Sequence, residues 1–247
     1  MANTKVYIHE LIDIIGHNRG RYMHHMTANW VPLAIEERNQ RCYGVWGTVG
    51  STGRWPEVVN MWELDGWPGL VANFEHEMRG SAMQDPSLAA WWAEAASFRR
   101  GGIDRILVPA PWTRTIDELV ADGAGCPLYA HELVTLRRGT SPLFLDALRD
   151  EGVAALESFG FSLLGAFDVA MVNDCECVVI WGIPDWTTWA AFEQAQRGDA
   201  LRRWRTTLDG FDADWRRTLL VDAPLAPLRL GRQPEVRDRE PIDGGNG

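Results

Sequence analysis

Residues 6–14 are rich in β-forming residues, which predicts a first strand. Residues 19–38 change to helical spacing, with an apolar stripe formed by Tyr22, Met23, Met26, Trp30 and Leu33. Two strands, 41–49 and 58–64, follow around the turn-rich loop GSTGRWPE. A second helical region, in which residues 85–87 open a helix, leads to a last strand at 104–108. The predicted order is β-α-β-β-α-β, the ferredoxin-like pattern.

The same pattern recurs roughly half the chain length later. YIHEL at 7–11 matches YAHEL at 129–133, and YGVWGTV at 43–49 matches FSLLGAF at 161–167. VVNMWELDGW at 58–67 matches CVVIWGIPDW at 177–186, and ILVPAP at 106–111 matches LLVDAP at 219–224. Four matches in the same order, at offsets between 113 and 122, indicate an internal duplication.

Duplication predicts how the two copies pack. A four-stranded antiparallel sheet with helices on one face leaves its other face bare, and a second copy of the sheet can cover it. The predicted fold class is α+β, with two tandem ferredoxin-like β-α-β-β-α-β units packed sheet to sheet as an intramolecular α+β barrel. The expected boundaries are a unit at 1–111, a linker at 112–126, a unit at 127–224 and a tail at 225–247.

Composition narrows the classes of partner. The net charge is −10 and basic residues are not clustered, which argues against nucleic acid and against an anionic membrane surface. The sequence has no apolar run approaching 18 residues and no signal-like N-terminus, so a cytoplasmic protein is expected. The four cysteines are expected to be reduced thiols, and no metal site is predicted, because neither H-E-x-x-H nor a histidine pair at i, i+4 occurs.

Three features resemble the NIPSNAP family within the dimeric α+β barrel superfamily. They are Tyr7 in the first strand, the strand-to-helix junction VVNMWELDGW, and the segment DPSLAAWWAEA. The resemblance covers most of residues 7–224 and implies a small-molecule pocket between the sheet and its helices. The superfamily includes cyclases, isomerases, cofactor-free monooxygenases and haem proteins, so the resemblance alone does not fix the reaction.

The histidines are distributed unevenly between the copies. Five of the six lie in the first copy, and the second copy keeps the helical stripe but has no counterparts of His24 and His25. Histidine exchanges protons near neutral pH, so this asymmetry favours the first copy as the site. Helical spacing predicts that His25 faces inward near Tyr22 and Asn29, with His24 to the side. The alternative is a histidine pair on the helix surface.

His9 and Glu10 point to opposite faces of the first strand and recur as His131 and Glu132. If both faces are buried, both side chains need partners. The recurrence favours a structural pair near the pseudo-twofold axis. The alternative is a catalytic role, in which His9 reaches the pocket between sheet and helix as an acid or base.

The leading hypothesis is a cofactor-free lyase, isomerase or cyclase that acts on a hydrophobic or aromatic metabolite by acid/base catalysis. His25 or His9 would move the proton, and a tyrosine would hold the developing oxyanion. The candidate residues are His25, His9, Tyr22, Tyr7, His24 and Glu10 for catalysis and Met26, Trp30, Trp46, Trp62 and Asn29 for substrate binding. The alternatives are a haem-dependent oxygenase or dehydratase, with His25 as axial ligand, and a non-catalytic binding or assembly protein. Exposed sheet edges favour a homodimer.

Overall fold

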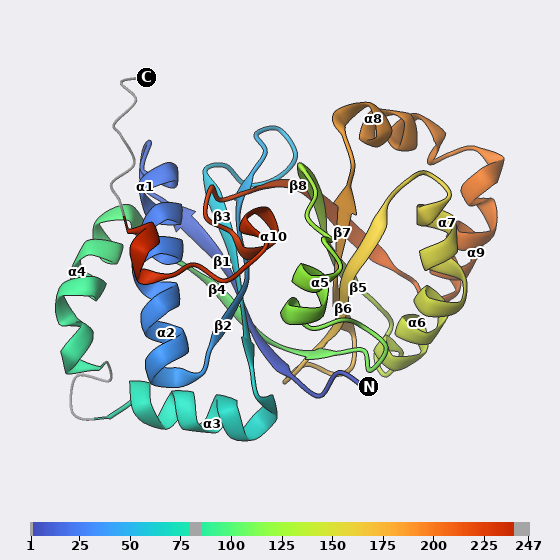
Figure 1. Cartoon of the computed structure of the whole chain (residues 1–247). Helices are drawn as coiled ribbons and strands as arrows, with labels where there is room; N and C mark the ends of the chain where they lie inside the picture. Colours follow the sequence, from blue (N-terminus) through green and yellow to red (C-terminus); the bar gives the residue numbers. More distant parts are fainter. Residues whose placement is uncertain (1, 80–84, 240–247) are drawn as a thin grey trace.

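Eight antiparallel strands form one closed barrel in the computed structural model, which describes residues 2–79 and 85–239 (Figure 1). The first half contributes β1 (Val6–Ile14), β2 (Arg41–Thr48), β3 (Glu57–Leu64) and β4 (Arg99–Pro109). The second half contributes β5 (Leu128–Thr135), β6 (Ser162–Val169), β7 (Glu176–Ile183) and β8 (Asp214–Asp222). The strand order is β4-β1-β3-β2 in one half and β8-β5-β7-β6 in the other, and β2–β8 and β4–β6 pairing closes the barrel. This confirms the predicted tandem ferredoxin-like fold.

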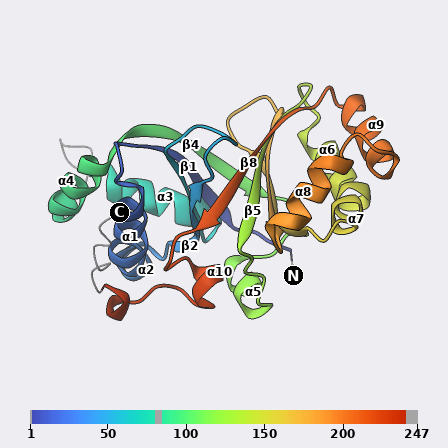
Figure 2. The same cartoon turned by 90° about the horizontal axis from the view of Figure 1, so that it is seen from above.

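Helices cover the outer faces of the two half-barrels at opposite ends of the molecule (Figures 1 and 2). In the first half these are α1 (Arg19–His24), a π-helical segment (His25–Trp30), α2 (Val31–Arg38), α3 (Gly66–Glu77), a 3₁₀ turn (Pro86–Leu88) and α4 (Ala89–Phe98). In the second half they are α6 (Ser141–Ala147), a π-helical segment (Leu148–Gly152), α7 (Val153–Glu157), α8 (Trp186–Ala195), a 3₁₀ turn (Asp199–Leu201) and α9 (Arg202–Gly210). A π-helical segment therefore lies at the equivalent place in both halves.

The two segments predicted as linker and tail contain secondary structure. The linker region holds α5 (Ile116–Ala121), which begins with a capping box between Thr115 and Glu118. The segment after β8 holds α10 (Pro227–Leu230) and a 3₁₀ turn (Val236–Asp238). Its Gln233 side chain exchanges two hydrogen bonds with the backbone of Cys42, so this segment is fastened to β2. The domain boundaries themselves stay a prediction.

The core consists of three main apolar layers. One lies inside the barrel and is aromatic, with Tyr7, Tyr43, Trp46, Tyr129 and Phe167 all completely buried. The other two lie between each half-sheet and its helices. Because successive strand residues point to opposite faces, each strand supplies one side to the barrel interior and the other to a sheet–helix layer. None of the described helices combines the length and the apolarity needed to cross a membrane.

Candidate functional site

A cavity of about 790 Å³ lies between the sheet of the first half and its helices. Its apolar wall is aromatic and includes Trp30, Trp62, Phe74, Trp91 and Trp92. The rings of Trp30 and Trp91 have centroids 4.8 Å apart, and those of Trp91 and Trp92 are 4.7 Å apart. Large apolar cavities with a few convergent polar groups are typical of small-molecule sites.

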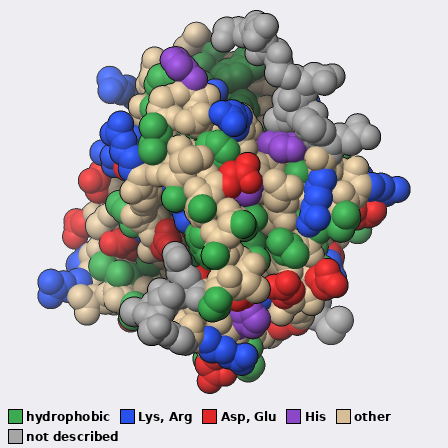
Figure 3. All heavy atoms as spheres, turned by 90° about the vertical axis from the view of Figure 1, so that its left-hand side faces the viewer, with side chains coloured by type: hydrophobic (Ala, Val, Ile, Leu, Met, Phe, Trp, Pro, Cys, Tyr) green, Lys and Arg blue, Asp and Glu red, His purple; other side chains and the backbone are tan. Residues whose placement is uncertain are grey.

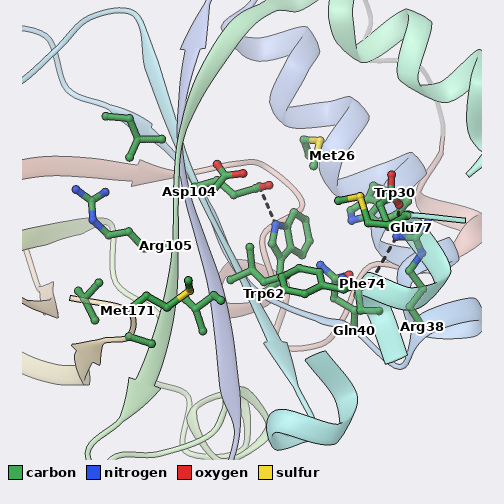
Figure 4. Close-up of a pocket in the computed structure, with 18 of the residues that line it drawn as sticks. Met26, Trp30, Arg38, Gln40, Trp62, Phe74, Glu77, Asp104, Arg105 and Met171 are labelled. Atoms are coloured by element: carbon green, nitrogen blue, oxygen red, sulfur yellow. Dashed lines mark hydrogen bonds and ion pairs between the residues drawn. The ribbon is translucent and has the colours of Figure 1, made fainter. Parts of the chain in front are cut away.

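Figure 4 shows how the wall is arranged around the strands of the first half. Trp62, Phe74 and Trp30 lie on the helix side, and Asp104 reaches to the same side from β4. Arg105 and Met171 lie on the other side of the strand, where the cavity continues around it. The outer face of this half carries interspersed acidic and basic side chains (Figure 3).

Glu10 is a partly buried carboxyl group of the wall. Its Oε2 accepts hydrogen bonds from Trp62 Nε1 at 2.8 Å and from Asn60 Nδ2 at 2.9 Å, while its Oε1 has no hydrogen-bond partner among the described residues. Oε1 is not fully enclosed by protein atoms, so it faces the cavity. Burial raises the pKa of the Glu10 carboxyl, the neighbouring Asp104 charge adds to this, and the Trp62 and Asn60 hydrogen bonds oppose it.

Asp104 stands directly opposite Glu10 in the β1–β4 register, at the exposed rim of the cavity. The surrounding strands desolvate its carboxyl enough to raise the pKa, and the Arg99 charge acts in the opposite direction. No ion pair within 4.0 Å joins Glu10 or Asp104 to a basic side chain of the described residues. The site therefore presents two carboxyl groups without a cation in contact.

The predicted site residues fall into three places. Glu10, Met26, Trp30 and Trp62 line the cavity. Tyr22, His24, His25 and Asn29 belong to the helix behind the wall and do not line it. Tyr7, His9 and Trp46 point into the barrel, on the opposite face of the sheet. The structure thus brings four of the eleven candidates together in one cavity. It places the side chains of His9 and Glu10, which are neighbours on β1, on opposite faces of the sheet.

His25 supports the wall from behind. Its ring stacks on Trp91, with centroids 4.9 Å apart, and its Nδ1 accepts a hydrogen bond from Asn29 Nδ2 at 3.1 Å. Burial lowers the pKa of His25, and the carboxylate of Glu94, 3.6 Å from Nδ1, acts in the opposite direction. His25 is therefore a neutral, packed imidazole. Tyr22 is also completely buried, and its hydroxyl accepts a hydrogen bond from Asn60 Nδ2 at 2.9 Å.

The wall does not fit a haem held by histidine. An axial ligand must direct a ring nitrogen into the haem cavity. No histidine is among the described residues that line this cavity, and His25 presents its ring to Trp91 instead.

His9 and Tyr7 have partners inside the barrel. His9 Nε2 lies 2.8 Å from Nε2 of His131, which confirms that the two repeated histidines contact each other across the two halves. Tyr7 donates a hydrogen bond to Glu63 Oε2 at 2.9 Å and receives one from Asn3. These contacts pair the Tyr7 hydroxyl and the Nε2 atoms of both histidines, whereas His9 Nδ1 is buried without a hydrogen-bond partner among the described residues.

Three side chains of the kind that bind metals come together next to Arg38, outside the residues that line the cavity. Ligand atoms of Glu37, His76 and Asp85 lie within 4.8 Å of one another. Asp85 also caps the following turn through Ser87 N and pairs with the guanidinium of Arg38 at 3.5 Å. These local partners account for the cluster, and the prediction that the protein has no metal site stays a prediction.

The second half has a much smaller cavity at the equivalent place, about 190 Å³. Glu132 again contacts a tryptophan, Trp181, but its other oxygen is bonded to Arg217. Asp104 was missed as a site residue, although the match of ILVPAP with LLVDAP, at an offset of 113, aligns it with Arg217. The opposite charges of Asp104 and Arg217 at this aligned position are the sequence feature that could have identified Asp104.

No family model matches this sequence, and no curated protein shows significant sequence similarity to it. Solved structures are similar at the level of fold. A provisionally assigned monooxygenase of Lactobacillus acidophilus has a TM-score of 0.55 at 12% identity, over 90% of this chain and 97% of its own. A provisionally assigned chlorite dismutase has a TM-score of 0.55 at 13% identity, over 92% and 98%.

A provisionally assigned monooxygenase of Fusobacterium nucleatum has a TM-score of 0.53 at 9% identity, over 90% of this chain and 94% of its own. Similarities at this level of identity show the fold alone, an α+β barrel, which is closed here within one chain. The narrower resemblance to the NIPSNAP family has no matching family model and stays a prediction.

Proposed function

We propose that this protein is a small-molecule enzyme that acts on a hydrophobic or aromatic metabolite by acid/base catalysis, with Glu10 as the group that carries the proton. The observation behind the proposal is the Glu10 carboxyl, held at one oxygen and free at the other, at the wall of a tryptophan-lined cavity. An enzyme requires an open cavity between sheet and helices, whereas an assembly protein does not.

The surroundings of Glu10 suit this chemistry. Trp62 and Asn60 fix the orientation of the carboxyl through Oε2 and leave Oε1 to exchange a proton with a bound molecule. Burial moves the pKa upward, toward the neutral range in which a carboxyl group can both accept and return a proton. The aromatic wall lowers the local polarity around a bound molecule, which strengthens its polar contacts with the carboxyl group. A lyase, isomerase or cyclase reaction needs proton transfer of this kind.

A probe with a weakly acidic C–H bond tests the role of Glu10. In 5-nitrobenzisoxazole a base removes the proton at C3 while the N–O bond breaks, and the product is a coloured phenolate. We expect Glu10→Gln to lose on the order of 100-fold in kcat/KM, because the amide cannot take the proton. The matched control is His25→Gln, which we expect to keep most of the activity. Equal rates for wild type and Glu10→Gln would refute the assignment.

The pH profile of the same reaction provides a second prediction. The carboxylate form is the base, so the rate should rise with pH and level off above the Glu10 pKa, which lies above the ordinary 4.5. Asp104→Asn removes a neighbouring negative charge and should move the midpoint to lower pH. Arg99→Gln removes a positive charge and should move it to higher pH. Identical midpoints in all three proteins would show that another group titrates.

A further inference from the structure

Glu10 and Glu132 occupy equivalent positions in the two halves. Each lies on the first strand of its half and accepts a hydrogen bond at Oε2 from a tryptophan of the adjacent strand. The bond from Trp62 Nε1 to Glu10 is 2.8 Å, and the bond from Trp181 Nε1 to Glu132 is 3.0 Å. The partner of Glu132 Oε1 in the second half therefore indicates what kind of group can bind at Glu10 Oε1.

In the second half that oxygen holds a guanidinium. Arg217 stands opposite Glu132 in the β5–β8 register, and its Nε donates a 2.8 Å hydrogen bond to Oε1. The Cζ atom of Arg217 lies 4.6 Å from the ring centroid of Phe192 and 4.7 Å from that of Trp215. Only 9% of the side chain is exposed. A carboxylate and aromatic faces together form a favourable cation site.

In the first half the same register position is Asp104, which adds a second negative charge where the second half has a positive one. Glu10 Oε1, the counterpart of the oxygen bound by Arg217, has no partner among the described residues. Arg99 also lines the cavity, but its Cζ lies over the ring of Trp92, 5.3 Å from the centroid, and it forms no ion pair within 4.0 Å with either carboxyl group.

We infer that the first-half cavity binds a molecule with a cationic nitrogen head, an ammonium or a guanidinium, on an apolar body. The head would lie between Glu10 Oε1 and Asp104, as the guanidinium of Arg217 lies against Glu132. The body would occupy the aromatic part of the cavity, whose volume is about 790 Å³ compared with about 190 Å³ in the second half. This inference deepens the proposed function, because it names the substrate class of the same cavity.

Three probes that share one body and differ in charge test the inference. Phenethylamine is cationic, 2-phenylethanol is neutral and phenylacetate is anionic at neutral pH. Titrated against the wild-type chain by calorimetry or NMR, phenethylamine should bind at least about tenfold more tightly than 2-phenylethanol, and phenylacetate should bind most weakly. Equal affinities for the amine and the alcohol, or tighter binding of phenylacetate, would overturn the inference.

Substitutions at Asp104 test the location. Asp104→Arg should supply the first half with its own guanidinium and abolish phenethylamine binding, whereas the matched charge change Glu157→Arg, on the exposed side of α7, should leave binding unchanged. If Asp104→Arg does not fold, as judged by circular dichroism, Asp104→Asn keeps the shape and should weaken phenethylamine binding several-fold. Unchanged affinity in the folded Asp104 variants would overturn the inference.

The two proposals can fail separately. If the protein binds the three probes equally but still catalyses the benzisoxazole reaction, the proposed substrate class is wrong and the acid/base role of Glu10 stands. If the protein prefers phenethylamine but Glu10→Gln keeps full activity, the cation site stands and the catalytic role of Glu10 is wrong.

Discussion

The adjacent residues His9 and Glu10 serve different sites because strand side chains alternate between faces. Inside the barrel only one of the two facing Nε2 atoms of His9 and His131 can donate to the other. His9 Nδ1 is buried without a hydrogen-bond partner among the described residues. We therefore assign His9 as the donor, because this leaves only an unpaired acceptor and no unpaired N–H group. The pair is neutral and structural.

Acid should destabilise the protein through this pair. Burial and the Arg105 charge lower the pKa of His131 to about 4, and burial lowers that of His9 as well. Between about pH 6.5 and 4 the unfolded chain binds protons that the folded chain does not, so the free energy of unfolding falls as the pH falls. For His131 alone the loss is about 3 kcal/mol.

Urea denaturation at several pH values measures this slope. His131→Gln should be less stable than wild type at pH 7, because His9 loses its partner, but should lose less stability on acidification. The comparison with the variant also removes the opposite contributions of Glu10 and Asp222, whose raised pKa values favour folding at low pH. Parallel pH curves for the two proteins would contradict the prediction.

At the scale of elements, the long first helix shows the limit of hydrophobic spacing. Its extent, 19–38, agrees with the sequence, but residues 25–30 form a π-helical segment that the 3.6-residue period does not reveal. Met26 and Trp30 line the cavity, as the helical stripe predicts, whereas His25 packs against Trp91.

The second strand of each half bends at a glycine. The register of β2 shifts next to Gly44 and that of β6 next to Gly165, and the Trp46 and Phe167 rings occupy the space that a Cβ atom would need. We expect Gly44→Ala and Gly165→Ala each to lower the free energy of unfolding by about 2 kcal/mol or more, through overpacking. Chemical denaturation checks this, with Gly210→Ala, which has open space, as the control. Equal stability of all three variants would contradict the account.

At the scale of the whole molecule, each half supplies the other with a cover for its inner face. Tyr7, Tyr43 and Trp46 of the first half pack with Tyr129 and Phe167 of the second. We expect a fragment of residues 1–111 to self-associate, because its inner face would otherwise be bare to water. Size-exclusion chromatography with light scattering measures this. A monomeric fragment with a cooperative unfolding transition would contradict the prediction.

The strands, the helices that cover them and the duplication can be predicted from the sequence, because these depend on local periodicity and on similarity between distant segments, whereas α5 and α10 are not predicted. From these the closed barrel could be predicted, since a bare sheet face must be covered. Which residues share the cavity emerges from the folded chain: strand register places Asp104 beside Glu10, and His25 packs behind Trp91. Register and helix phase depend on packing over the whole molecule, and a change of one residue redirects a side chain to another face.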